Sequence, residues 1–178
     1  MKTKQITKSA LFLVLFFLSS NIIPAIPIFG IPFTLQTLVI SLIPFYFSYK
    51  EIIIWYLALL FITLIGIPMM SGFSSGLTCL IGPSAGFIYG WLIKMIVIKK
   101  ALQYNNKYIL FIIMLISSLI DLMLGGIYLA LFTNIDILIS TKTMIVTFMP
   151  LEIVKTILTL VVVARVPKSL QDGKLIYE

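Results

Sequence analysis

The sequence predicts an all-α integral membrane protein with six transmembrane helices. Of its 178 residues, 61% are hydrophobic and only 11% are charged, whereas soluble proteins contain about 25% charged residues. The mean hydropathy is +1.16. The apolar residues also fall into separate runs long enough to cross a bilayer or most of it. Lipid is therefore the expected solvent of a single membrane domain over residues 1–178.

Six apolar runs are separated by proline, glycine, lysine and polar clusters. The predicted spans cover residues 9–24, 33–48, 52–70, 83–98, 108–132 and 150–165. Several are shorter than the usual 20 residues and need flanking turns or a thinner bilayer. Lysines before the first span resemble the start of a signal peptide, but no clear small-residue cleavage site follows them. The first span is therefore expected to be retained.

The basic residues predict the orientation of the spans, because cytoplasmic loops are rich in lysine and arginine. Clusters occur at the N-terminus, in the second and fourth gaps and in the C-terminal tail, and the other gaps contain only Lys142. Both termini are therefore expected in the cytoplasm, on one side of a membrane that the chain crosses several times. The scatter of the 13 basic residues argues against a nucleic-acid partner.

Prolines stand before or at the predicted outer starts of three helices. They are Pro32, Pro83 and Pro150. Proline suits the first turn of a helix, where its missing N–H is not needed. Helix N-termini carry unpaired N–H groups and partial positive charge, which favour an anionic or carbonyl-bearing ligand. Each proline alone more often just ends a loop, but three together indicate a ligand site.

The last span contains an acid and a base close together, Glu152 and Lys155, in the run FMPLEIVK. Ionisable residues inside membranes are costly and indicate a functional site. Asp121 lies in the middle of the fifth span, where it either contacts Lys155 or another polar group of a pocket, or forms a neutral hydrogen bond between helices. Lys94 is expected to extend towards the cytoplasm.

A glycine-rich segment, SGFSSGLTCLIG at residues 71–82, precedes the fourth span. It is expected to be a loop that covers or contacts a ligand. Gly86 and Gly90 form a small-residue step that most often serves helix packing. Phe87, Tyr89 and Trp91 are candidate apolar walls, although packing or an interfacial position is the commoner use of aromatic residues.

Four stretches occur in an order that resembles the biotin-specific S components, the BioY family, of energy-coupling factor (ECF) transporters. They are IPFTLQTLVI, GIPMM, GPSAGFIYGWL and FMPLEIVK. The resemblance implies a six-helix subunit that binds biotin from outside. Its implied partners are a transmembrane coupling subunit and two cytoplasmic ATPases, which would use ATP. The sequence departs from the family pattern at four positions, where Thr, Gly, Tyr and Asp are usual in the family. They are Ser84, Ala85, Phe87 and Glu152.

The predicted ligand-binding residues combine these motifs with the polar residues of the spans. They are Thr34, Gln36, Ser71, Gly72, Ser84, Gly86, Phe87, Tyr89, Asp121, Glu152 and Lys155. Glu152 is expected to accept from the ureido N–H groups of biotin, and Lys155 to donate to its carbonyl or carboxylate. Thr34 and Gln36 serve either the ligand or hydrogen bonds between helices.

Catalysis is not expected, because the sequence contains no histidine, no Ser-His-Asp set and no phosphate-binding G-x-x-x-x-G-K-S/T motif. Neither a resident cofactor nor a metal site is expected in this chain. The second functional class is a self-sufficient proton- or ion-coupled carrier that uses Asp121, Glu152 and Lys155.

Overall fold

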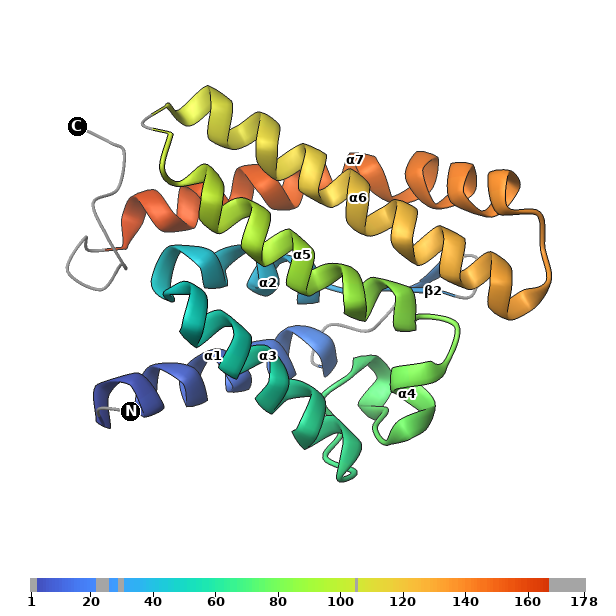
Figure 1. Cartoon of the computed structure of the whole chain (residues 1–178), viewed down its shortest axis with the longest axis horizontal. Coiled ribbons are helices and arrows are strands. Elements are labelled where there is room, and N and C mark those ends of the chain that lie inside the picture. Colours follow the sequence, from blue (N-terminus) through green and yellow to red (C-terminus); the bar gives the residue numbers. More distant parts are fainter. Residues whose placement is uncertain (1–2, 22–25, 29–30, 105, 167–178) are drawn as a thin grey trace.

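The computed structural model describes residues 3–21, 26–28, 31–104 and 106–166, and these residues are predominantly helical (Figure 1). Helices α1 (Thr3–Asn21), α2 (Gln36–Tyr46), α3 (Tyr49–Leu64) and α4 (Leu77–Ile81) form the first half. Helices α5 (Ala85–Ala101), α6 (Lys107–Thr133) and α7 (Ile137–Arg165) form the second. A short 3₁₀ helix, η1, covers Ser71–Phe73. Among the described helices, α6 and α7 are long and apolar enough to cross a membrane, by length and composition, and α2 is a shorter apolar helix.

The all-helical prediction missed a two-stranded hairpin between α1 and α2. Strands β1 (Ile26–Ile28) and β2 (Ile31–Phe33) pair antiparallel, with Pro27 opposite Pro32. Pro32 therefore lies in a strand and not in the first turn of a helix, because α2 begins only at Gln36. Pro83 lies just before Ser84, which occupies the N-cap position of α5.

The predicted start of the last span at Pro150 is wrong. Helix α7 begins at Ile137, where the Asp136 carboxylate caps it by accepting from the Ile139 N–H over 2.9 Å. The preceding helix ends in a turn at Asn134, whose left-handed φ of 57° is one that asparagine tolerates well. Pro150 lies inside the helix, so Glu152 is a residue of the helix interior and not of its first turn.

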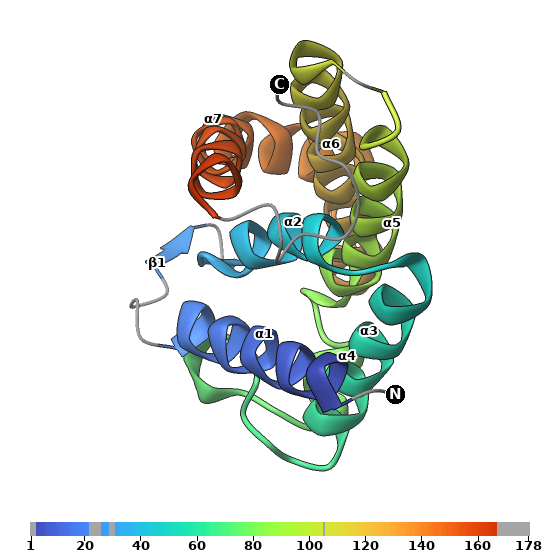
Figure 2. The ribbon, with the colours of Figure 1, turned by 90° about the vertical axis from the view of Figure 1, so that its left-hand side faces the viewer.

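Helices α5, α6 and α7 pack side by side, and α2 lies between this group and α1 (Figures 1 and 2). Glycines allow the close approach. A Cβ at Gly86 would come within 2.7 Å of the Leu124 carbonyl oxygen, and one at Gly126 within 2.7 Å of the Thr141 Cα. Gly86 therefore packs α5 against α6, as the small-residue step predicted for its commoner use.

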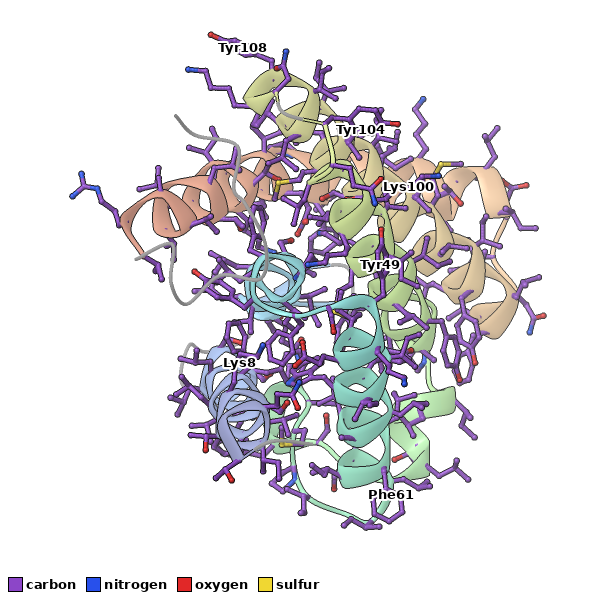
Figure 3. All side chains as sticks on the ribbon, turned by 60° about the vertical axis from the view of Figure 1, so that its left-hand side comes forward. Lys8, Tyr49, Phe61, Lys100, Tyr104 and Tyr108 are labelled. Carbon is purple, nitrogen blue, oxygen red and sulfur yellow. The ribbon has the colours of Figure 1, made fainter. Side chains whose placement is uncertain are left out.

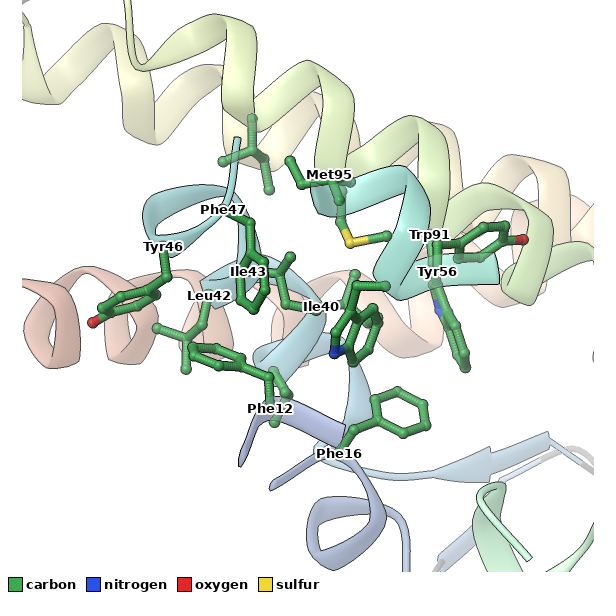
Figure 4. Packing of buried hydrophobic residues seen from close by; sticks show 14 of the residues in the cluster. Phe12, Phe16, Ile40, Leu42, Ile43, Tyr46, Phe47, Tyr56, Trp91 and Met95 are labelled. Atoms are coloured by element: carbon green, nitrogen blue, oxygen red, sulfur yellow. The ribbon is translucent and has the colours of Figure 1, made fainter. Parts of the chain in front are cut away.

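The larger hydrophobic core joins α1, α2, α3 and α5 (Figure 4). The Phe16 ring of α1 meets two indoles edge to face, with centroids 5.9 Å from Trp55 and 5.5 Å from Trp91. Aromatic pairs prefer this geometry, which adds about 0.5–1.5 kcal/mol to the stabilisation from burial. The core therefore fixes Trp91, and with it one wall of the cavity described below.

The start of α1 and the end of α7 lie at the same end of the molecule (Figure 1). Figure 3 brings this end forward and shows Lys8, Lys100 and three tyrosines, at positions 49, 104 and 108, on it. The Lys8 ammonium donates to the Tyr46 carbonyl over 2.6 Å, so it pairs with the negative end of the α2 dipole. The cationic clusters of α1 and α5 thus share one end of the fold.

Candidate functional site

A cavity of about 100 Å³ lies where α2, α5, α6, α7 and the segment before α5 meet. Its wall has a charged part and an apolar part. The lining residues are Thr34, Gln36, Thr37, Met70, Ser71, Ser74, Cys79, Ser84, Phe87, Ile88, Trp91, Asp121, Leu122, Phe148, Glu152 and Lys155. Eight of the eleven residues predicted for the site are thereby brought together from five parts of the chain.

Glu152 is the centre of the charged part. It is 4% exposed, and both of its carboxylate oxygens accept hydrogen bonds. Oε1 accepts from the Lys155 Nζ at 2.9 Å and from the Thr37 hydroxyl at 2.7 Å, and Oε2 accepts from the Lys94 Nζ at 2.7 Å. A buried carboxylate is tolerated when it is paired and hydrogen-bonded in this way.

Lys94 contradicts its prediction. Its side chain does not extend to water at an end of the fold but is 1% exposed, with its ammonium on the Glu152 carboxylate. The Glu152 carboxylate provides a charged partner within the fold, so the Lys94 ammonium does not need to reach water. The available signal was charge balance, since the predicted spans contain two acids, Asp121 and Glu152, and two bases deep enough to pair with them, Lys94 and Lys155.

Thr37 was also missed, although it directly follows the predicted pair Thr34 and Gln36. Its hydroxyl accepts from the Lys155 Nζ at 2.8 Å and donates to Glu152, so it closes a three-membered network. Thr34 and Gln36, which were predicted to bind the ligand, line the cavity. The Thr34 hydroxyl donates to Gln36 Oε1 at 2.8 Å, and the Gln36 amide donates weakly to the Met70 sulfur at 3.9 Å.

Three of the predicted site residues do not line the cavity. Gly72 lies in η1 with φ of +67°, and Gly86 packs against α6. Tyr89 is 46% exposed, and its hydroxyl donates to the Leu80 carbonyl of α4 at 2.6 Å. The ring of Phe87 does line the cavity, where it also packs against Gly125.

The segment between α3 and α5, residues 65–84, covers one side of the cavity and is anchored to three helices. Asn21 of α1 accepts from the Phe73 N–H at 2.7 Å and donates to the Pro68 carbonyl at 3.2 Å. The tyrosine hydroxyls of α5 and α6 donate to the last carbonyls of α4, Tyr128 reaching Ile81 at 3.0 Å. We call residues 65–84 the covering segment.

Asp121 lies in the cavity wall on α6 and is 2% exposed. Its Oδ1 has no hydrogen-bond partner among the described residues. Gly90 of α5 provides the space for this carboxyl group, because any Cβ there would collide with Oδ1. The group interacts electrostatically with Lys94, Lys155 and Glu152. The hydrogen bond between helices that was one alternative for Asp121 is thus not made by Oδ1 in the part of the chain described.

The arrangement can bind a small, partly polar ligand. The ammonium group of Lys155 lines the cavity and suits a carbonyl or carboxylate, while Phe87, Trp91 and Phe148 offer apolar surface. Among the described residues, no three His, Cys, Asp or Glu side chains gather to hold a metal ion.

Comparison with known proteins gives consistent matches over nearly the whole chain. A sequence model of the BioY family matches residues 1–172. The chain is 36% identical over 136 residues to biotin transporter BioY2 of Lactococcus lactis subsp. cremoris, covering 75% of each protein. It is 31% identical over 177 residues to biotin transporter BioY of the same strain, covering 94% of this chain and 93% of that protein.

The fold also matches a solved structure, that of the S-component for biotin from an ECF-type ABC transporter. The TM-score is 0.83 at 30% sequence identity, and the match covers 92% of this chain and 90% of the other. The similarity therefore extends to the arrangement of the helices that form the cavity.

Proposed function

Because the chain belongs to the BioY family, we propose that it is the substrate-binding S component of an ECF-type ABC transporter and that its ligand is biotin. The observation that carries this proposal is the cavity, whose wall combines the ion pair of Lys155 and Glu152 with apolar side chains. The similarity to two biotin transporters and to the S-component for biotin supports it.

Biotin has three chemically distinct parts that fit such a wall. Its ureido ring has two N–H donors and one carbonyl acceptor, its thioether ring is apolar, and its tail ends in a carboxylate. The buried ammonium group of Lys155 is suited to the carbonyl or the carboxylate. Phe87, Trp91 and Phe148 are suited to the apolar rings.

The proposed topology has six membrane crossings, with both termini in the cytoplasm and the covering segment outside. The common position of the start of α1 and the end of α7 supports it, and so does the lysine-rich character of that end (Figures 1 and 3). Biotin would then enter past the covering segment from the outer side of a bacterial plasma membrane.

The energy for transport would come from partner subunits. The sequence lacks the phosphate-binding motif of P-loop ATPases. A transmembrane coupling subunit and two cytoplasmic ATPases of an ECF module would therefore use ATP to release biotin into the cell.

Calorimetric titration of the detergent-purified chain with biotin tests the ligand. Saturable binding of one biotin per chain is expected, with loss of binding in Lys155→Met. Lys142→Met makes the same chemical change at an exposed position and is expected to bind like the wild type. Absence of saturable binding by the wild type would contradict the proposal.

Reconstitution into vesicles tests the energy source. Biotin uptake is expected only when the coupling subunit, the ATPases and ATP are present. Uptake by this chain alone, driven by a pH or voltage gradient, would instead identify the self-sufficient carrier.

A further inference from the structure

Thr37 lies in the cavity wall with its hydroxyl between an acid and a base. The hydroxyl donates to Glu152 Oε1 at 2.7 Å and accepts from the Lys155 Nζ at 2.8 Å. The acid and the base also pair directly, with Nζ 2.9 Å from Oε1. A hydroxyl has a single proton, so its donation to the carboxylate leaves it the role of acceptor towards the ammonium. The three side chains therefore form a closed ring of hydrogen bonds.

This ring connects two helices. Thr37 is the second residue of α2, whereas Glu152 and Lys155 lie inside α7. Threonine is branched at Cβ, which restricts its side-chain rotamers, but the lysine ammonium ends a long and flexible side chain. A hydroxyl in a restricted position on α2 thus fixes the end of a flexible side chain on α7. The place of the Lys155 ammonium in the wall therefore depends on Thr37.

Glu152 is also held from outside the cavity. The Lys94 Nζ donates to its Oε2 at 2.7 Å, although Lys94 is not one of the lining residues. The carboxylate is thus fixed at both oxygens, by α2 and α7 at Oε1 and by α5 at Oε2. Lys155 is the cation among the residues that line the cavity. The network therefore presents one charged donor in a defined place.

We infer that Thr37 is a positioning residue for ligand binding. Its hydroxyl orders the Lys155 ammonium and the Glu152 carboxylate before the ligand enters, so that Lys155 donates to a carbonyl or carboxylate of the ligand. The inference rests on the proposed function, which supplies a ligand with these groups. Groups that are ordered in advance bind more tightly, because the cost of ordering them does not fall on the binding step. Thr37 thus acts on affinity through Lys155.

Two substitutions of Thr37 test this role by calorimetric titration of the detergent-purified chain with biotin. Thr37→Val keeps the shape of the side chain and removes the hydroxyl. It is expected to bind biotin roughly ten- to hundredfold more weakly, because hydrogen bonds to charged groups are the stronger ones. Thr37→Ser keeps the hydroxyl and is expected to bind within about threefold of the wild type. Wild-type affinity of Thr37→Val, or an equal loss in both variants, would overturn the inference.

Thr63→Val is the matched control, because it makes the same chemical change at another buried threonine. The Thr63 hydroxyl donates to the Leu59 carbonyl within α3 at 2.8 Å, and Thr63 does not line the cavity. This variant is expected to bind biotin like the wild type, and a loss equal to that of Thr37→Val would overturn the inference. No biotin binding by the wild type would contradict the proposed function, whereas wild-type binding that Thr37→Val leaves unchanged contradicts this inference alone.

A second comparison separates positioning from direct contact with the ligand. Lys94 does not line the cavity, so it acts on the ligand through Glu152. If Thr37 acts through the same network, the factor by which Thr37→Val weakens binding is expected to differ by about threefold or more between the wild type and Lys94→Met. Equal factors would show that Thr37 acts on its own and would overturn the positioning role. The comparison of Thr37→Val with Thr37→Ser does not require Lys94→Met to fold and tests the inference by itself.

Discussion

The Lys94 ammonium of α5 donates to Oε2 of Glu152 on α7 over 2.7 Å, and both side chains are almost completely buried. This ion pair joins two helices that lie far apart in the sequence, and its carboxylate lines the cavity. The same carboxylate holds Lys155 through its other oxygen. One acid therefore positions two cations, and its three donors come from α2, α5 and α7.

Replacing Lys94 by methionine is expected to destabilise the fold. Glu152 Oε2 would lose its donor while remaining buried, which costs roughly 1–3 kcal/mol of the free energy of unfolding. The pair with Lys155 would remain, so the loss stays below that of an isolated buried charge. Thermal unfolding of the detergent-purified variant measures the effect. Lys142→Met is the exposed control, and equal melting temperatures of the two variants would contradict the expectation.

Asn21→Ala is expected to loosen the covering segment. The variant loses the hydrogen bonds to Phe73 and Pro68 that join this segment to α1. Opening should become roughly tenfold more frequent, since each bond contributes about 0.5–1.5 kcal/mol. Cys79 reports it, because it is the sole cysteine of the chain and lines the cavity. The rate of its reaction with a thiol reagent is the measurement.

The control for that measurement is Ser19→Ala, on the same helix. The Ser19 hydroxyl donates to the Phe16 carbonyl within α1 and does not reach the covering segment. Its labelling rate is expected to equal that of the wild type. If Asn21→Ala labels at the same rate as Ser19→Ala, the two hydrogen bonds do not restrain the segment.

Gly126→Ala is expected to force α6 and α7 apart. The added Cβ would lie within 2.7 Å of the Thr141 Cα, which belongs to the backbone and cannot turn aside. Overpacking of this kind costs typically about 1–3 kcal/mol. Ser118→Ala introduces the same residue elsewhere in α6 without a close approach. A melting temperature of Gly126→Ala as high as that of Ser118→Ala would show that the helices adjust freely.

The stability of the corner between α2 and α3 is expected to depend on pH through Glu51. Burial raises the pKa of Glu51, but hydrogen bonds from the Ser48 backbone and hydroxyl, together with the Lys8 ammonium 3.5 Å away, outweigh it and lower the pKa below its usual 4.5. Because the pKa is lowered in the folded state, Glu51 stabilises the fold above pH 4.5, and this contribution disappears as the pH falls through the folded-state pKa.

Glu51→Gln removes this titration. Melting temperatures measured from pH 6 to pH 3 are expected to fall more steeply below pH 4.5 for the wild type than for the variant. The other acids titrate in both proteins and cancel in the difference. Parallel curves would show that the Glu51 carboxylate contributes no pH-dependent stability.

Much of the fold follows from local properties of the sequence. Long apolar runs indicate helices, and helices α3, α5 and α6 overlap the runs at residues 52–70, 83–98 and 108–132. Proline was the misleading signal. Pro150 looked like a helix start, yet the Asp136 cap and the Asn134 turn begin the helix thirteen residues earlier. An interior proline is tolerated when neighbouring helices support the backbone, as in membrane proteins.

The cavity was only partly predictable from the sequence, because some of its contacts depend on how the helices pack. Four of its residues belong to sequence motifs, and these motifs indicated a ligand site. They are Thr34, Gln36, Glu152 and Lys155. Lys94 has no such neighbour in the sequence, and its role depends on which face of α5 meets α7. That choice is made by the packing of Gly90 and Trp91, which a single sequence does not reveal.

The helices of this chain differ greatly in length. At 1.5 Å per residue, the 29 residues of α7 extend about 43 Å, whereas the 16 residues of α3 extend about 24 Å. A hydrocarbon layer is about 30 Å thick, so α7 is longer than the layer and α3 is too short to cross it. With the proposed six-span topology, α7 would tilt or protrude while the membrane thins around α3, so lipid chain length would become a physical variable of this protein's stability.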